Sequence, residues 1–242
     1  MSVIYEPRGK ALEYAPLAVN LYDGCQHGCG YCYAPNVLHK DRFQFIQAQP
    51  RANIIQRLTQ DASRSPQDGT KGSVLLCFTC DPYQPLEDTY GLTRQAIQEL
   101  HKYGYRVSVL TKAGPLATRD FDILTPTDRF GQTLTFTSED DSRRWEPGAA
   151  LPLVRMENLK KAHGHGIPTW VSLEPVIDPS QSLELIRLSH NYVDEFKVGK
   201  WNHDPRAQLV DWRKFGHDAV DLLESLGKRY YVKEDLRKYL RE

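Results

Sequence analysis

Three cysteines lie close together in the segment NLYDGCQHGCGYCYAP, which covers residues 20–35. Cys25, Cys29 and Cys32 have the spacing C-x3-C-x2-C, with glycines interleaved between them. Thiolates are the usual ligands of iron–sulfur clusters, and a cubane cluster needs one ligand for each of its four irons. Three cysteines therefore leave one iron open to a small molecule, and the glycines allow the backbone to wrap closely around the cluster.

A structural zinc site is the alternative for the same loop. Zinc takes four Cys or His ligands, so His27 or a distant cysteine would have to complete the set. Cys77 and Cys80 form a C-x2-C pair of the kind that zinc sites use. However, a strand is expected there, and residues three apart on a strand point to opposite faces. The odd total of five cysteines argues against a disulfide framework and favours metal or redox chemistry.

Strand-like and helix-like segments alternate through nearly the whole chain. Repeated strand–helix units predict an α/β fold whose parallel sheet curls, through right-handed crossovers, into a partial (β/α)6 TIM-like barrel. In such folds, the loops that carry functional residues lie at the carboxyl ends of the strands. The expected strands are 16–22, 73–79, 106–111, 132–137, 169–174 and 195–199, the expected helices are 52–63, 89–103, 116–124, 154–163, 182–189 and 209–226, and 65–72 is an expected loop.

Length and composition indicate one domain over residues 1–242, with a core at about 17–202 and a C-terminal helical cap at about 207–242. Hydrophobic residues make up 40% of the chain and charged residues 26%, which is typical of a globular protein with a real core. Lys plus Arg is 31 and Asp plus Glu is 31, so the net charge gives no general support for nucleic-acid binding. The absence of a long apolar run or a signal-peptide pattern predicts a cytoplasmic protein without a membrane partner.

The cysteine loop resembles the signature of the radical S-adenosylmethionine (SAM) superfamily, including an aromatic residue, Tyr31, just before the third cysteine. The resemblance implies a radical SAM core with one [4Fe–4S] cluster, whose open iron binds SAM. Reductive cleavage of SAM then yields a 5′-deoxyadenosyl radical that abstracts hydrogen from a substrate. It also implies an external reductant of the flavodoxin or ferredoxin type. Tyr31 and the backbone near Tyr33 are expected to lie against the adenine.

Further short motifs resemble the spore photoproduct lyase and DNA repair photolyase-like branch. They are CDPYQPLE at 80–87, LTK at 110–112, EPG at 146–148 and VGKWN at 198–202. The resemblance implies that the SAM pocket includes Thr79, Cys80, Asp81, Lys112, Thr137 and Ser138. Ordinary local roles compete with this interpretation, since Asp81 before a proline suits a turn and Ser138 suits a helix N-cap.

The chain departs from the lyase at the hydrogen-donating cysteine. That cysteine lies two residues before the pocket serine in the lyase, and Phe78 holds the position here. Cys80 replaces the serine and is either a hydrogen-atom relay or a small filler, while Cys77 should face away on a regular strand. We therefore expect a relative with a different substrate, in a lyase or transferase class that the sequence does not resolve.

Polar residues that follow the later strands are candidates for substrate binding or catalysis. Glu174 ends the fifth strand, and Lys200 and Asn202 follow the sixth. Glu174 ends an apolar run, so it should be partly buried and should need a partner, for which Lys112 or Lys200 is available. The sequence therefore predicts a radical SAM enzyme that acts on an unidentified substrate. A nucleic-acid lesion lyase and a non-catalytic zinc or iron–sulfur module are the alternatives.

Overall fold

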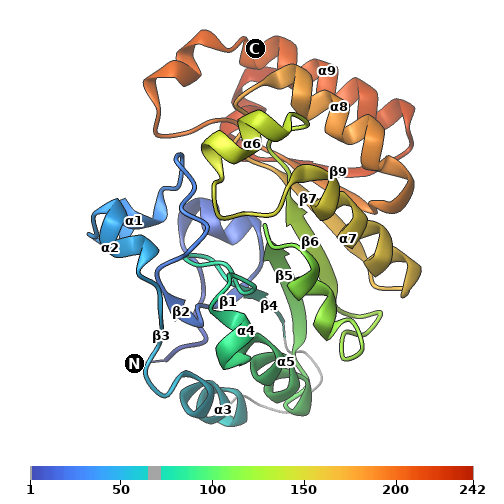
Figure 1. The fold of residues 1–242 in the computed structure, drawn as a ribbon. Helices are drawn as coiled ribbons and strands as arrows, with labels where there is room; N and C mark the ends of the chain where they lie inside the picture. Colours follow the sequence, from blue (N-terminus) through green and yellow to red (C-terminus); the bar gives the residue numbers. More distant parts are fainter. Residues whose placement is uncertain (1, 65–71, 242) are drawn as a thin grey trace.

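One sheet organises the computed structural model, which describes residues 2–64 and 72–241 (Figure 1). The sheet has seven strands in the order β1-β4-β5-β6-β7-β8-β9, and every neighbouring pair is parallel. Its strands are β1 (Leu17–Val19), β4 (Ser73–Leu76), β5 (Arg106–Thr111), β6 (Arg129–Thr133), β7 (Thr169–Leu173), β8 (Glu195–Val198) and β9 (Arg229–Val232). Two further strands, β2 (Tyr22–Asp23) and β3 (Gln49–Pro50), form a small antiparallel pair.

The strands are parallel because helical crossovers connect them and cover the outer face of the sheet (Figure 1). The strands of such parallel sheets are typically buried on both faces, and all five residues of β7 are buried. The α-helices are α1 (Ala34–Val37), α2 (Arg42–Ile46), α3 (Ile54–Arg64), α4 (Glu87–Tyr90), α5 (Leu92–Lys102), α6 (Glu139–Trp145), α7 (Pro152–Gly164), α8 (Pro179–Ser189), α9 (Trp212–Ser225) and α10 (Glu234–Arg237). Short 3-10 segments are η1 (Gly9–Glu13), η2 (Pro115–Asp120), η3 (His190–Tyr192), η4 (Pro205–Leu209) and η5 (Lys238–Leu240).

The N-terminal segment closes the open side of the partial barrel, between the edge strands β1 and β9. Tyr5 pairs with Ala18 of β1 in an antiparallel bridge. At the other end of the segment, the Glu13 carboxylate accepts hydrogen bonds from the Tyr231 hydroxyl (3.1 Å) and the Glu234 backbone N–H (2.8 Å). Residues 5–14 therefore bridge the two sheet edges.

The predicted α/β partial barrel is confirmed, with local differences. β4 ends at Leu76, earlier than the predicted strand 73–79, and β6 covers Arg129–Thr133 instead of 132–137. The predicted helix 89–103 is split at Gly91, whose φ of +57° is left-handed. In place of the predicted helix 116–124 there is the shorter 3-10 segment η2, which begins one residue earlier and ends at Asp120. β9 extends the sheet beyond residue 202 into the predicted C-terminal cap. Most of the expected loop at 65–72 lies outside the described residues.

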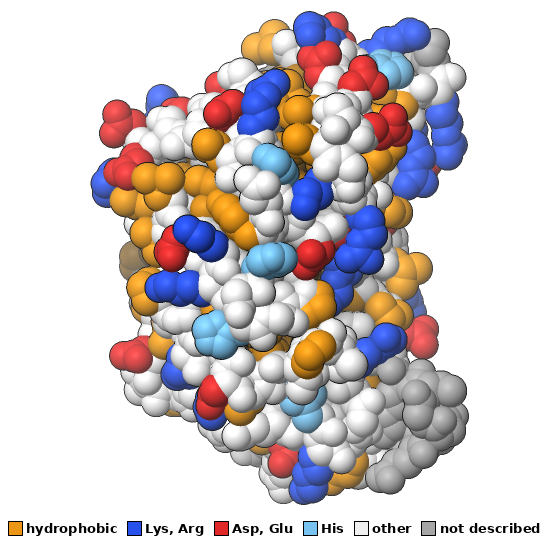
Figure 2. All heavy atoms as spheres, turned by 90° about the vertical axis from the view of Figure 1, so that its right-hand side faces the viewer, with side chains coloured by type: hydrophobic (Ala, Val, Ile, Leu, Met, Phe, Trp, Pro, Cys, Tyr) orange, Lys and Arg blue, Asp and Glu red, His pale blue; other side chains and the backbone are white. Residues whose placement is uncertain are grey.

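The helical side of the molecule carries an ordinary mixed-charge surface. Figure 2 shows the face that lies on the right of Figure 1, where basic and acidic side chains are interspersed and no field of one sign dominates. Within the part of the chain that the structure describes, no helix has both the length and the apolar character needed to cross a bilayer.

Candidate functional site

A cavity of about 520 Å³ lies at the carboxyl ends of the sheet strands. Its volume falls in the range of small-molecule pockets. Residues from the loops that follow β4, β5, β7 and β8 meet the cysteine loop in its wall. The predicted site residues in this wall are Cys25, Cys29, Tyr31, Cys32, Tyr33, Thr79, Cys80, Asp81, Lys112, Glu174, Lys200 and Asn202.

Thr137 and Ser138, which the resemblance places in the SAM pocket, are not among the residues that line this cavity. The backbone N–H groups of both residues donate to the Gln181 side-chain oxygen at 2.9 Å. The Ser138 hydroxyl caps α6 by accepting from the Asp141 N–H at 3.2 Å. Because β6 ends at Thr133, the following residues lead away from the cavity into α6, and Thr133 lines the wall instead.

The three cysteines of the loop are free thiols; Cys29 is buried, and Cys25 and Cys32 are partly buried. Burial raises the pKa of Cys29 to about 12 and also raises the pKa values of Cys25 and Cys32. A buried thiolate is therefore stable only beside a compensating cation, and iron in a bound cluster would provide that charge. The three cysteines of the loop therefore suit a metal cluster that binds three thiolates.

The backbone wraps closely around this loop. A Cβ atom on Gly24 would collide with the Phe45 carbonyl oxygen, and a Cβ on Gly148 would collide with the Gln26 carbonyl oxygen. In the described ranges, no three His, Cys, Asp or Glu side chains are gathered as ligands of a single metal ion. A cubane differs from such a site because its thiolates bind separate irons.

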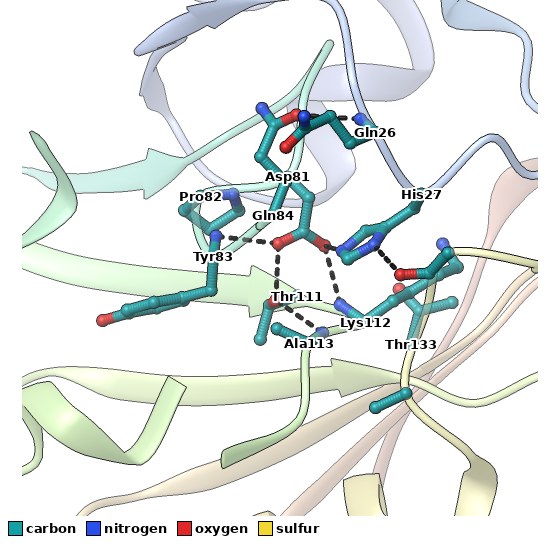
Figure 3. Close-up of polar contacts among 12 residues, drawn as sticks. Gln26, His27, Asp81, Pro82, Tyr83, Gln84, Thr111, Lys112, Ala113 and Thr133 are labelled. Atoms are coloured by element: carbon teal, nitrogen blue, oxygen red, sulfur yellow. Dashed lines mark hydrogen bonds and ion pairs between the residues drawn. The ribbon is translucent and has the colours of Figure 1, made fainter. Parts of the chain in front are cut away.

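His27 was one candidate for the fourth ligand of a zinc site. In the structure, both of its ring nitrogens contact other residues. Nδ1 donates to the Gly148 carbonyl oxygen at 2.7 Å. Nε2 lies 3.2 Å from Oδ2 of Asp81 (Figure 3). The imidazole therefore ties the cysteine loop to two other loops, and it is not free to complete a zinc site in this arrangement.

Asp81 is the centre of the polar contacts in Figure 3. Its Oδ1 accepts from the Thr111 hydroxyl (2.6 Å) and the Tyr83 N–H (2.9 Å), and its Oδ2 accepts from the Lys112 N–H (2.7 Å). Burial alone would raise the pKa of Asp81, but the His27 charge and these hydrogen bonds lower it to about 2. Asp81 thus lines the cavity as a carboxylate whose two oxygens already have protein partners.

A second set of hydrogen bonds joins the cysteine loop to the loop that follows β4. The Gln26 N–H donates to the Gln84 side-chain oxygen (2.8 Å), and the Gln84 amide donates to the Gly24 carbonyl (3.3 Å). The Leu86 N–H donates to the Gln26 side-chain oxygen (2.7 Å). The segment 81–86 therefore clamps the cysteine loop. Neither Gln26 nor Gln84 was predicted as a site residue, because two residues 58 positions apart carry no local sequence signal of their contact.

Lys112 supplies a partly buried cation to the cavity. Its Nζ lies 5.5 Å from the Tyr31 ring centroid, and no carboxylate of the described residues forms a salt bridge with it. Burial alone would lower the pKa of Lys112, but the negative charges of Cys29 and Glu146 raise it. The Thr79 hydroxyl is also buried without a hydrogen-bond partner in the described structure. A cation and an unpaired hydroxyl in one cavity suit a polar, anionic ligand group.

Tyr31 is held from behind by a buried ion pair. Its hydroxyl donates to Glu146, which forms a salt bridge with Arg155. Arg155 and Glu146 are 0% and 1% exposed, so this ion pair lies in the interior of the protein. Burial alone would raise the pKa of Glu146, but the Arg155 and Lys112 charges lower it.

Glu174 has partners that the sequence did not suggest. Its carboxylate accepts hydrogen bonds from the Tyr14 hydroxyl (2.7 Å) and the Asn202 amide (3.2 Å), and it forms a salt bridge with Lys233. The prediction that Lys112 or Lys200 pairs with Glu174 is therefore wrong. The Lys200 Nζ lies 3.3 Å from the Tyr239 hydroxyl instead.

Cys77 and Cys80 both line the cavity, so the expectation that Cys77 faces away is wrong. The strand ends at Leu76, and neither cysteine has the strand geometry on which that expectation depended. Burial, together with the neighbouring Cys80 thiol, raises the pKa of Cys77. The cavity therefore holds two further cysteines besides the three in the loop.

Sequence comparisons find relatives that are themselves uncharacterized, and no protein-family model matches the chain. A protein of Acidianus two-tailed virus is 28% identical over 251 residues, covering 92% of this chain and 79% of the viral protein. A protein of Methanocaldococcus jannaschii is 25% identical over 174 residues (71% of this chain, 64% of that protein). One from Mycobacterium tuberculosis is 25% identical over 186 residues (71% and 52%). The chain thus spans about half to four fifths of these relatives.

Solved structures share the fold over nearly the whole chain. Spore photoproduct lyase complexed with dinucleoside spore photoproduct has a TM-score of 0.72 at 13% identity, over 95% of this chain and 78% of the lyase. SuiB of Streptococcus suis, bound to S-adenosylmethionine, has a TM-score of 0.68 at 13% identity, over 92% of this chain and 51% of SuiB. The chain therefore shares the fold of spore photoproduct lyase and SuiB, which agrees with the fold that the sequence resemblance implied.

Proposed function

We propose that this chain is a radical SAM enzyme that holds a [4Fe–4S] cluster with Cys25, Cys29 and Cys32. The observation that carries the proposal is that these cysteines share one cavity with Lys112, a partly buried cation without a carboxylate partner in the described residues. The cavity lies at the carboxyl ends of parallel strands, where α/β barrels place their active sites. When bound and reduced, such a cluster supplies the electron that cleaves SAM to a 5′-deoxyadenosyl radical.

The residues of the chain have distinct roles in this proposal. Lys112 binds the carboxylate of SAM through a charge-assisted contact, and the Thr79 hydroxyl provides a further hydrogen bond. Tyr31 and Tyr33 supply aromatic faces for the adenine. Asp81 does not bind the cofactor directly; it fixes the backbone at Lys112 and, with His27, the cysteine loop.

The far wall of the cavity is the substrate side. It contains Phe78 and Leu110, which exclude water, and Glu174, Lys200 and Asn202, which offer polar contacts. Exclusion of water protects a reactive intermediate from side reactions. The substrate itself and the reaction class, lyase or transferase, are left open by this proposal.

The proposal is tested by anaerobic reconstitution with iron and sulfide, reduction with dithionite, and chromatography for 5′-deoxyadenosine after addition of SAM. Cys29→Ala is the control, because it removes one cluster ligand. We expect 5′-deoxyadenosine from the wild type only. A colourless protein that takes up one zinc ion and leaves SAM intact would show that the loop is a structural site and would overturn the proposal.

A further inference from the structure

The cavity wall carries more cationic side chains than carboxylates. Among its described residues there are two carboxylates, Asp81 and Glu174. The lysine and arginine side chains of the same wall are Arg8, Lys10, Lys112, Lys200 and Lys233. Which kind of ligand this wall suits depends on which of these charges already have a partner inside the protein.

Both carboxylates of the wall have protein partners. The oxygens of Asp81 accept three hydrogen bonds from neighbouring loops. Oε2 of Glu174 accepts a hydrogen bond from the Tyr14 hydroxyl at 2.7 Å and pairs with Lys233. Oε1 of Glu174 accepts from the Asn202 amide at 3.2 Å. A cationic ligand group would therefore have to replace a contact that the protein already makes.

Two of the cations are paired as well. Lys233 forms its salt bridge with Glu174 inside the cavity wall. Lys10 forms a salt bridge with Asp235 of α10. The charges of these two lysines are therefore compensated by the protein itself.

The other three cations have no such compensation. No carboxylate in residues 2–64 and 72–241 lies within salt-bridge distance of Arg8, Lys112 or Lys200. Lys112 lies beside Tyr31 of the cysteine loop, where the proposed function uses it to bind SAM. Arg8 and Lys200 therefore provide positive charge for a second ligand in the same cavity.

Lys200 is a partly buried cation that aromatic side chains hold in place. Its Nζ lies 5.2 Å from the ring centroid of Trp212 and 5.0 Å from that of Tyr239, and it donates to the Tyr239 hydroxyl at 3.3 Å. Aromatic rings attract a cation but supply no counter-charge. An ammonium group has three N–H donors, so further donors stay available for a ligand. A carboxylate or phosphate oxygen is the group that such a cation binds most strongly.

Arg8 lies at the mouth of the cavity. It is exposed, yet it lines the cavity as part of the N-terminal segment that bridges β1 and β9. A guanidinium group can form two parallel hydrogen bonds to a carboxylate or phosphate. Positive charge at the mouth of a cleft also raises the local concentration of anions.

We propose that the substrate of this chain is a small molecule with a carboxylate or phosphate group, which Lys200 binds and Arg8 attracts to the mouth of the cavity. This proposal rests on the proposed function, which places the reaction beside SAM in the same cavity. A small anion fits better than nucleic acid, because nucleic acid is bound through many phosphate contacts on a basic surface. The chain has 31 Lys plus Arg and 31 Asp plus Glu. Lys200 is thus assigned as a specificity-determining residue.

Binding is measured by ligand-observed NMR titration of the full chain, reconstituted with its cluster and saturated with SAM so that Lys112 is already occupied. Glycerol 3-phosphate and glutarate are the phosphate and carboxylate probes, and glycerol and glutaramide are their uncharged counterparts. We expect at least one anionic probe to bind about tenfold or more tightly than its counterpart, as a charge-assisted hydrogen bond predicts. The probe that gains affinity shows whether the site prefers phosphate or carboxylate.

Variants of Lys200 test the residue itself. Lys200→Met should abolish the preference for the anionic probe, whereas Lys200→Arg, which keeps the positive charge, should retain it. Arg8→Met should weaken binding by less than about threefold, because Arg8 is exposed. Lys160→Met, at an exposed position outside the cavity wall, is the matched control and should bind as the wild type does. Cluster content and the Kd for SAM, measured in each variant, show whether the rest of the cavity is intact.

Three results would overturn the proposal. Charged and uncharged probes that bind the wild type alike would exclude an anion site, and a preference that survives Lys200→Met would exclude Lys200. A short single-stranded DNA oligonucleotide that binds more tightly than both small anions, and does so through Lys200, would replace the small substrate with nucleic acid. A wild type that takes up no cluster overturns the proposed function instead, and the two failures are therefore distinguishable.

Discussion

The Nε2 atom of His27 lies 3.2 Å from Oδ2 of Asp81, and this contact joins the cysteine loop to the loop after β4. The other ring nitrogen donates to Gly148, so one imidazole connects three loops of the site. In the proposed cluster site, neither His27 nor Asp81 is a ligand. We expect these two residues to hold the three cysteines in the positions from which they would bind the cluster.

His27→Ala should weaken cluster binding without removing a ligand. Loss of groups that orient metal ligands typically lowers metal affinity about 10- to 100-fold, and we expect an effect of that order. The measurement is iron retained per protein after reconstitution and challenge with a chelator. His163→Ala, an exposed position on α7, is the control and should retain iron as the wild type does. Equal retention in both variants would contradict the role assigned to His27.

Lys112→Met should weaken SAM binding. A hydrogen bond to a charged group contributes about 1.5–3 kcal/mol, so the Kd for SAM should rise by about tenfold or more. Equilibrium dialysis of SAM with the reconstituted protein measures this effect. Lys160→Met, which removes an exposed lysine outside the cavity, should leave the Kd unchanged. An unaltered Kd in Lys112→Met would remove this lysine from the proposed SAM site.

Glu146→Gln should destabilise the fold strongly, because it leaves the Arg155 guanidinium buried without its counter-charge. Breaking a buried ion pair costs about 3–5 kcal/mol of unfolding free energy. Urea unfolding measures the loss. The control is Glu139→Gln, which breaks the exposed helical pair with Arg143 and should cost less than about 0.5 kcal/mol. Similar losses of unfolding free energy in the two variants would show that the buried pair does not contribute more than the exposed pair.

Asp128 should make stability depend on pH in the acid range. Burial alone would raise its pKa, but hydrogen bonds from His101, the Val107 N–H and Thr125 lower it. The folded carboxyl therefore binds a proton more weakly than the unfolded one. Its contribution to stability is present above the unfolded pKa of about 3.9 and is lost as the pH falls through the lower folded pKa.

The Asp128 prediction is checked by unfolding free energies measured at several pH values below about 5. Asp128→Asn should be less stable than the wild type near neutral pH and should lose less stability on acidification. Asp221→Asn, at an exposed position of α9, should follow the wild-type curve. An Asp128→Asn curve parallel to that of the wild type would show that this carboxyl does not contribute.

Local patterns in the sequence were sufficient for the fold class and for most of the cavity wall. Alternating strand and helix periodicities predict a parallel sheet, and such a sheet brings the residues after its strands to one edge. Lys112, Glu174 and Asn202 meet the cysteines for that reason. The spacing of the cysteines within one loop is likewise a local property.

Tertiary structure alone decided where strands end and which polar groups pair. β6 ends at Thr133, which removes Thr137 and Ser138 from the cavity, and β4 ends at Leu76, which brings Cys77 into it. Lys233, which follows the edge strand β9, reaches Glu174. A buried charge takes whichever partner the fold brings within a few ångströms, and residues distant in the sequence carry no periodic signal of that proximity.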